Sequence, residues 1–331
     1  MSGPPGGNPG IYEMYQAELG LYRRILPPLS GLYDIGYSAL PDGSLAILRS
    51  DRDLLKLWQH NLKKGYQDKK ILPDGQKGSL FIYDGAIEWP VFEMPLENPF
   101  PLLDRSESGN WVFVDSQPGE HRQNAVIYSV SGQVLHRFSL GRFVQHVQYD
   151  RQDMIWAGYF DQGFFRKLHY EQDSITITGL LRFSAYGRPL WGTPDPVMDC
   201  YALNVSGDRA WVYDFPDFRI MEVSNSGMEN IWQSDIRGAR ALAVHKSYAL
   251  LGGGYGDEFD RVALVHLDGK KAKTLGRFSL NLQETEELRI SYFGGRGAFL
   301  HFVWDNIWIR LHVEEVRQWL MQQAGYASSG V

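Results

Sequence analysis

The residues of this sequence that could do chemistry are an imidazole and carboxylates near the ends of predicted strands. His146 and Asp199 lie at the starts of two such strands, and Asp161 follows a third. Imidazole and carboxylate groups can hold a metal ion together, which makes these three residues the candidate metal ligands. No spacing in the sequence fixes them to one another, so a hydrogen-bonded structural histidine is the competing interpretation.

Acidic residues recur where predicted second strands of the repeating hairpins end. They are Asp51, Asp115, Asp161, Asp214, Asp257 and Asp305. One carboxylate per repeat suggests a ring of acids on one face, but Asp side chains also cap tight turns. We favour the turn role for most of them. Asp161 and Asp214 are the exceptions, because each follows aromatic residues that could line a pocket.

Standard catalytic motifs are absent from the sequence. It contains no Gly-x-Ser-x-Gly elbow, no phosphate-binding loop and no metalloprotease helix motif. We therefore predict no catalytic residue and no cofactor. Cys200 is the single cysteine, which rules out a disulfide framework within the chain.

Composition describes an ordinary folded protein with many aromatic residues. The chain has 331 residues, a formal net charge of −6 and 14% aromatic residues, which twisted sheets accommodate well. The mild negative charge argues against a nucleic-acid partner. Neither a signal peptide nor an apolar run of about 18 residues is visible, so we expect a cytoplasmic protein without a membrane partner.

Two kinds of hairpin alternate along the chain. The first kind has an aromatic-rich second strand and occurs at 33–51, 101–116, 144–161, 199–214, 239–254 and 287–305. The second kind has a glycine turn and occurs at 80–92, 125–138, 180–191, 219–232 and 262–275. A four-stranded unit that repeats about every 40–50 residues is typical of β-propeller blades. We expect Trp111, Trp156 and Trp211, at equivalent positions, to be buried between blades.

The hairpin count predicts how the ring closes. The sequence contains six hairpins of the first kind but only five of the second, so the last blade lacks its outermost strand. Leu21–Leu29 can supply that strand by pairing beside Ile307–Leu311. The sequence thus predicts an all-β, six-bladed propeller over residues 11–313. A disordered tail (1–10) precedes it, and a C-terminal helix (314–325) and a tail (326–331) follow it.

One repeat resembles a known family. Residues 144–166 read VQHVQYDRQDMIWAGYFDQGFFR and are similar to the two-component-regulator propeller repeat, which they match at Asp150, Ile155, Trp156, Gly158 and Gly163. Asp153 stands where that repeat usually has glycine. The resemblance implies the propeller fold and brings no catalytic residue with it.

A basic insertion enlarges the first predicted blade. Arg52–Lys77 carries several lysines together with apolar residues such as Trp58. A solvated excursion with a buried Leu/Trp anchor is one interpretation. Because loops longer than about 12–15 residues are frequently functional, a partner-binding element is the other.

Two functions follow from these features. The first is a non-catalytic binding or scaffold protein that presents one propeller face to a protein partner, for example to neutralise a toxin or assemble a complex in a bacterium. Its candidate partner-binding residues are Trp58, Lys63, Lys64, Lys69, Lys70, Tyr159, Phe160, Asp161, Asp214 and Phe215. The alternative is a metal-dependent propeller hydrolase or lactonase acting on a small molecule, with at least three polar ligands converging in the channel. The fold alone does not separate the two.

Overall fold

The computed structural model describes most of the chain, and all but two of the strands that it describes fall into six antiparallel units of four. The described residues are 22–24, 31–63, 72–116, 123–160, 167–170, 173–176, 178–193, 197–282, 291–304 and 306–328. We number the four-stranded units as blades 1 to 6 in chain order. The following ranges give the strands of each blade from the innermost to the outermost.

Blades 1 to 3 are separate meanders. Blade 1 consists of β2 (Tyr33–Ala39), β3 (Leu45–Ser50), β4 (Lys77–Tyr83) and β5 (Glu88–Pro95). Blade 2 consists of β6 (Leu102–Arg105), β7 (Trp111–Val114), β8 (Ala125–Tyr128) and β9 (Val134–Phe138). Blade 3 consists of β10 (Val144–Tyr149), β11 (Ile155–Tyr159), β14 (Leu180–Phe183) and β15 (Pro189–Gly192).

Blades 4 and 5 share a short parallel contact between their outermost strands. Blade 4 consists of β16 (Asp199–Ser206), β17 (Arg209–Phe215), β18 (Arg219–Ser224) and β19 (Gly227–Ser234). Blade 5 consists of β20 (Ala241–His245), β21 (Tyr248–Gly252), β22 (Arg261–Asp268) and β23 (Lys271–Ser279). Pairing of Gln233 with Lys271 joins β19 to β23.

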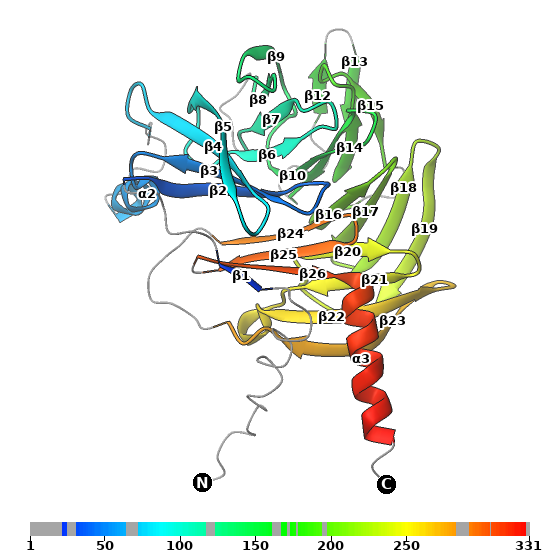
Figure 1. The fold of residues 1–331 in the computed structure, drawn as a ribbon. Helices are drawn as coiled ribbons and strands as arrows, with labels where there is room; N and C mark the ends of the chain where they lie inside the picture. Colours follow the sequence, from blue (N-terminus) through cyan, green and yellow to red (C-terminus); the bar gives the residue numbers. More distant parts are fainter. Residues whose placement is uncertain are drawn as a thin grey trace.

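Blade 6 combines the two ends of the chain, as predicted. It consists of β24 (Tyr292–Arg296), β25 (Phe299–Trp304), β26 (Ile307–His312) and β1 (Tyr22–Arg24). β1 pairs antiparallel with β26, with Tyr22 opposite Ile309 and Arg24 opposite Ile307 (Figure 1). The N-terminal strand therefore covers the edge that the last blade would otherwise leave open.

The innermost strands form a closed ring. β2, β6, β10, β16, β20 and β24 contact one another in that order, and β24 contacts β2 again. Figure 1 shows the sheets arranged around this common centre. The chain is an all-β propeller, which confirms the predicted fold class.

The hydrophobic core lies between blades rather than at the centre. Side chains alternate along a strand, so a strand between two neighbours must be apolar on both faces. In β3, Leu45 and Ile47 pack toward Trp308 of blade 6, whereas Ala46 and Leu48 pack toward Trp111 of blade 2. Each of the six core clusters in the described residues joins two neighbouring blades.

The predicted tryptophan positions are confirmed in two of three cases. Trp111 and Trp156 are fully buried, between blades 1 and 2 and blades 3 and 4 respectively. Trp156 donates a hydrogen bond to Asp150, 3.1 Å away. The prediction is wrong for Trp211, which is only half-buried because its ring packs at the margin of the core between blades 4 and 5.

Several elements lie outside the blades, among them the short 3₁₀ helix η2 (Gly256–Glu258) between β21 and β22. α2 (Leu54–Lys63) occupies the basic insertion, and the hairpin of β12 (Lys167–Tyr170) and β13 (Asp173–Thr176), which the sequence did not indicate, is inserted in blade 3. α3 (Val313–Ser328) buries Val316 and Trp319 against blade 5. None of the helices in the described residues has the length and apolar character needed to cross a membrane.

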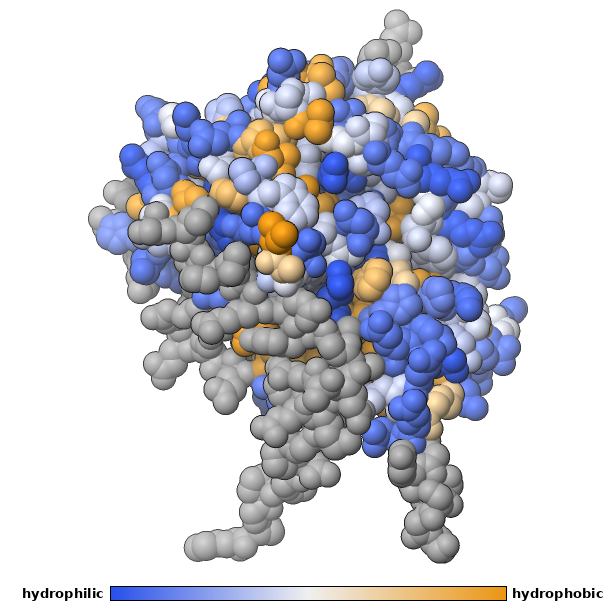
Figure 2. Space-filling view, viewed as in Figure 1, coloured by the Kyte–Doolittle hydropathy of each residue, from blue (hydrophilic) through white to orange (hydrophobic). Residues whose placement is uncertain are grey.

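The face of the molecule seen in Figure 2 is mostly hydrophilic and includes an apolar group. Figure 2 shows hydrophobic residues gathered over β5, β8 and β9. The exposed apolar residues of these strands and their turns are Ile87, Trp89, Val130, Val134 and Leu135. We call this group the rim patch. Tyr186 of blade 3 adjoins it, since its backbone carbonyl lies 2.9 Å from His136 Nε2 of β9.

Removal of the N-terminal strand should destabilise the ring. Deletion of residues 1–30 leaves the backbone groups of β26 without a partner along one edge, so we expect the melting temperature to fall by several degrees or more. A deletion of residues 1–10, which keeps β1, is the matched control and should melt like the intact chain. Equal melting of all three proteins would contradict the closure by β1.

Replacement of a fully buried tryptophan should lower the free energy of unfolding more than replacement of the half-buried Trp211. Trp111→Ala and Trp156→Ala each leave a large cavity between blades and should cost about 3–5 kcal/mol of unfolding free energy. Trp211→Ala removes less buried area and should cost about 1 kcal/mol. Denaturant unfolding measures all three, and a cost for Trp211→Ala equal to the other two would refute this core assignment.

Candidate site at the mouth of the central channel

The two faces of the ring are defined by strand direction. All six innermost strands begin at one face, which we call the top face, and the loops between second and third strands emerge there. α2 belongs to one of these loops. The turns between first and second strands lie at the opposite, bottom face, and they are polar, for example residues 106–110 (SESGN) and 206–209 (SGDR).

A pocket of about 310 Å³ opens where the innermost strands begin. Its lining comes from the first strands of blades 1, 2, 3, 4 and 6 and from the segment before β20. The pocket therefore occupies the top end of the central channel. No single blade builds it, which means that its shape depends on ring closure.

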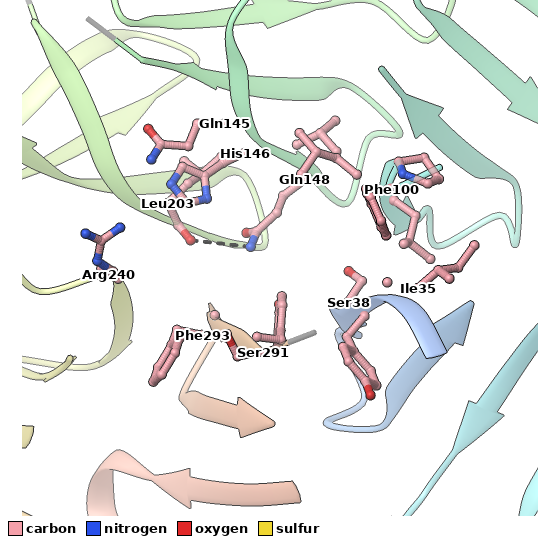
Figure 3. A pocket seen from close by; sticks show the side chains of 18 residues that line it. Ile35, Ser38, Phe100, Gln145, His146, Gln148, Leu203, Arg240, Ser291 and Phe293 are labelled. Carbon is pink, nitrogen blue, oxygen red and sulfur yellow. Dashed lines mark hydrogen bonds between the residues drawn. The ribbon is translucent and has the colours of Figure 1, made fainter. Parts of the chain in front are cut away.

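The pocket has a polar side and an apolar side. Figure 3 shows Gln145, His146 and Arg240 on one side, with Ile35 and Phe100 on the other. In the orientation that satisfies its neighbours, the Gln145 carboxamide nitrogen donates to Asp199 Oδ1 (2.9 Å) and to the Cys200 carbonyl (3.0 Å). This contact fixes the polar side by tying β10 to β16.

His146 presents a neutral imidazole to this pocket. Burial lowers the pKa of His146 to about 4, although its ring is hydrogen-bonded to the backbone of Cys200 and Tyr201. Its Nε2 atom is buried and has no hydrogen-bond partner among the described residues. A buried nitrogen without a partner is costly, so this atom marks a place where a ligand group can bind.

The floor of the pocket is a buried hydrogen-bond network centred on Gln148. Its Nε2 atom donates to the carbonyls of Leu203 (3.3 Å) and Gly295 (2.9 Å). Its Oε1 atom accepts from Val205 N (2.7 Å) and from Arg296 Nη1 (3.1 Å). One side chain thus joins blades 3, 4 and 6 across the channel.

An ion pair extends the floor to blade 2. Arg296 Nη2 lies 3.3 Å from Asp104 Oδ2, which also accepts a 2.6 Å hydrogen bond from Tyr149 N. Burial raises the pKa of Asp104 to about 6 even though Arg296 opposes that shift. β24 comes close enough to take part because Gly295 has no side chain: a Cβ there would lie 1.7 Å from the Leu242 carbonyl oxygen.

Aromatic side chains flank the pocket on the top face. Tyr201 stacks on Phe215 with ring centroids 5.2 Å apart, and its hydroxyl oxygen lies 3.0 Å from that of Tyr255. Phe218 packs edge-on against Phe215, and the Arg237 guanidinium lies 5.7 Å from the Phe218 ring centroid. We call Tyr201, Phe215, Phe218 and Tyr255 the aromatic cluster. Tyr255 is 45% exposed, so the cluster is open to solvent.

The basic insertion meets the pocket through its helix. Leu54 of α2 is buried, and the half-buried Trp58 packs edge-on against Phe100 with ring centroids 6.4 Å apart. Phe100 lines the pocket. Part of Trp58 is therefore used to hold α2 to the segment that leads into β6 of blade 2. Lys63 ends the helix, and Lys64, Lys69 and Lys70 lie outside the described residues.

Two of the other predicted partner-binding residues, Tyr159 and Asp214, are buried and stabilise the fold. Tyr159 is fully buried and donates a 2.6 Å hydrogen bond to the Leu140 carbonyl. Asp214 is buried, pairs with Arg219 at 2.6 Å and accepts from the Arg219 backbone N–H at 2.7 Å, which is the turn role that we favoured for most of the acids. Phe160 is 38% exposed on the top face. Asp161 lies outside the described residues.

The three candidate metal ligands are not brought together in the described part of the chain. His146 lines the pocket, whereas Asp199 does not and instead accepts from Gln145. Within the described ranges, no three His, Cys, Asp or Glu side chains are grouped so that they could hold a metal ion. Asp161, the third candidate, lies outside those ranges.

Sequence reasoning missed Gln148, Arg240 and Phe293. Gln148 lies in a strand whose pattern reads as alternating, and its amide looks like any outward-facing polar residue. Arg240 precedes a strand with nothing nearby to mark it. These residues come together in one pocket only because the ring closes, and no local sequence motif predicts that arrangement.

Comparisons with known proteins assign no function to this chain. A family model described as the YxzG family matches residues 174–301, less than half of the chain. No curated protein matches. The two-component-regulator propeller repeat is not among the matches, so that resemblance rests on the sequence motif.

Similar solved structures include three at low identity. A streptogramin B lyase has 13% identity and a TM-score of 0.49, covering 87% of this chain and 95% of that chain. The Cps50 (Swd1) β-propeller domain of Myceliophthora thermophila has 9% identity and a TM-score of 0.48, covering 87% and 98%. A nidogen/laminin complex has 9% identity and a TM-score of 0.48, covering 78% and 92%. At this level of similarity none of them assigns a substrate, ligand or partner to this chain.

The floor of the pocket should be sensitive to loss of its cation. Arg296→Met leaves the Asp104 carboxylate buried without its partner, which should cost about 3–5 kcal/mol of unfolding free energy. The double variant Asp104→Asn/Arg296→Met removes both charges and should recover part of that loss. Denaturant unfolding of the single and double variants tests this coupling. Additive costs, or a loss below about 1 kcal/mol for Arg296→Met, would contradict it.

Proposed function

We propose that this protein is a non-catalytic propeller that binds a protein partner through its top face. The observation that carries the proposal is the chemical contrast between the two ends of the central channel. The top end is surrounded by the half-buried or exposed rings of Phe100, Phe160, Tyr201, Phe215, Tyr255 and Phe293, whereas the bottom turns between first and second strands are polar. The exposed apolar residues of the bottom face, such as Ile87 and Val130, lie in turns between the outer strands. Tyr, Trp and Phe are enriched at the cores of protein interfaces because they bury much area at little entropic cost.

The aromatic cluster is held in place before any partner arrives. The ion pair of Asp214 with Arg219 fixes the turn that carries Phe215 and Phe218. Gly238 supports Tyr255 from below, since a Cβ at Gly238 would lie 2.7 Å from the Tyr255 ring. Preordered side chains lose less entropy on binding, which favours affinity. Asp214 and Tyr159 support this surface from behind rather than contact the partner.

The basic insertion adds charge beside the aromatic rings. Trp58 packs against Phe100 at the pocket, so α2 continues the top face outward from the channel. We assign Lys63, Lys64, Lys69 and Lys70 the role of steering an acidic partner, because rim charges act mainly on the rate of association. Neutralisation of a toxin and assembly of a complex are both compatible with such a surface.

No observation favours the hydrolase or lactonase alternative. That function needs several carboxylate or imidazole ligands converging in the channel. Among the described residues, the pocket lining contains one imidazole, His146, and no carboxylate. The polar groups deeper in the channel are already engaged with one another in the floor.

The proposal is tested by capture of a partner from the native source with two matched tyrosine variants. Tyr255→Ser removes an exposed ring of the aromatic cluster, whereas Tyr186→Ser removes a ring that is 70% exposed beside the rim patch. We expect Tyr255→Ser to weaken a stoichiometric interaction at least tenfold, or about 1.4 kcal/mol, and Tyr186→Ser to leave it unchanged. Quantitative capture at graded bait concentrations gives both values.

Melting curves of the variants exclude misfolding as the cause. Replacement of Lys63, Lys64, Lys69 and Lys70 with Glu should weaken the same interaction at low salt more than at high salt. Loss of binding in Tyr186→Ser alone would place the interface at the rim patch and overturn the proposal. Metal-dependent turnover of an ester or lactone by the purified protein would instead support the hydrolase or lactonase function.

A further inference from the structure

The charge of the pocket lining is unusual for this chain. The protein carries a formal net charge of −6, yet among the described residues the lining includes a guanidinium, that of Arg240, and no carboxylate. Arg240 is exposed, and its guanidinium belongs to none of the ion pairs among the described residues. An unpaired arginine at a concave site attracts anions, and its planar donors match a carboxylate.

The segment that carries Arg240 is fixed from below. Tyr213 donates a hydrogen bond to the Ile236 carbonyl at 2.5 Å, and Arg261 donates to the carbonyls of Arg237 and, at 2.9 Å, of Gly253. Tyr213 and Arg261 are both buried. The backbone of Arg240 donates to the Gly252 carbonyl at 2.8 Å. The guanidinium therefore projects from a rigid base at the edge of the pocket.

His146 supplies a second contact of a different kind. Its Nε2 atom is buried and has no hydrogen-bond partner in the described structure, whereas the ring is hydrogen-bonded to the backbone of Cys200 and Tyr201. With the other side of the ring hydrogen-bonded to backbone, Nε2 is the free acceptor of that tautomer. It suits an N–H donor, such as a peptide amide, rather than a second anionic group.

The remaining walls suit an apolar side chain of limited length. Ile35 and Phe100 form the side opposite Arg240, and Phe293 lies below (Figure 3). The floor formed by Gln148 and Arg296 closes the channel, because its hydrogen bonds cross from blade 3 to blades 4 and 6. A volume of about 310 Å³ accommodates one or two side chains but not a folded element.

We propose that this pocket, which we call the mouth, binds an acidic side chain within an extended segment of the protein partner. The carboxylate pairs with Arg240, a main-chain N–H of the segment donates to His146 Nε2, and an adjacent apolar side chain packs on Ile35 and Phe100. The proposal deepens the proposed function, because it names what the partner inserts at the top face.

The test uses peptides displayed from a random twelve-residue library. Selection against the intact protein should enrich sequences with Asp or Glu next to an aromatic or aliphatic residue. A selected peptide, and the same peptide with its acid changed to the matching amide, are then titrated against the protein by calorimetry. We expect the amide peptide to bind at least tenfold more weakly.

Matched charge reversals locate the contact. Arg240→Glu should weaken the acidic peptide at least tenfold, whereas Lys270→Glu, an exposed lysine in the bottom turn of the same blade, should change its affinity less than twofold. His146→Phe should also weaken the peptide, and it should do so equally for the acidic and the amide forms, because it removes the N–H contact. Melting curves confirm that each variant is folded.

Three outcomes would overturn the inference. They are a selection without acidic residues, a selection that yields no binding peptide, and equal affinity of Arg240→Glu and wild type for the acidic peptide. The proposed function is tested separately by Tyr255→Ser, because this substitution leaves the mouth intact. Partner capture lost in Tyr255→Ser but unchanged in Arg240→Glu would retain top-face binding and reject insertion at the mouth.

Discussion

The carboxamide of Gln148 is the interaction on which the arrangement of this propeller depends. It uses both donor hydrogens and its oxygen to join its own blade 3 to blades 4 and 6, through Leu203, Val205, Gly295 and Arg296. A buried amide with all its hydrogen bonds satisfied specifies one packing, whereas a partly satisfied one would be costly. Because the six core clusters act only between neighbours, this network is what fixes the distance across the channel.

The consequence is a channel whose two ends differ. Toward the bottom face the channel is filled by Gln148, Arg296 and Asp104, which are engaged with one another. Toward the top face the same strands line the mouth, where, among the described residues, the Arg240 guanidinium belongs to no ion pair and the His146 Nε2 atom has no hydrogen-bond partner. The floor thus gives the mouth a defined depth, and the aromatic cluster beside it gives a surrounding surface that can exclude water.

The fold could be predicted from sequence because its information is local and repeated. Each hairpin can be recognised from two apolar segments and the turn between them. β3 shows the reason, since Leu45 to Leu48 pack on both faces of the strand. The resemblance of residues 144–166 also has a physical basis. Asp153 adopts a left-handed conformation (φ 58°), the conformation that glycine usually supplies at that turn. The closing strand could be predicted because the sequence contains one hairpin of the second kind fewer than of the first. This difference leaves the last blade without a partner for β26.

The candidate site could be predicted only in part. His146 was identified as a polar residue at the start of a strand, but within the described ranges no group of three possible ligands forms around it to hold a metal ion. Asp214 looked like a surface acid because the sequence does not show that Arg219 returns to it across a turn. Arg240 and Gln148 come from different blades, and nothing in their local sequence shows that they share the channel.

Hydrogen exchange on the complex with the captured partner tests the central claim most directly, because it reports which face is covered. We predict slowed exchange at residues 237–240 and 291–294, around the mouth, and in α2, with the bottom turns at 106–110 and 206–209 unchanged. Protection confined to the bottom turns, or to β5 and β9 at the rim patch, would contradict binding through the top face.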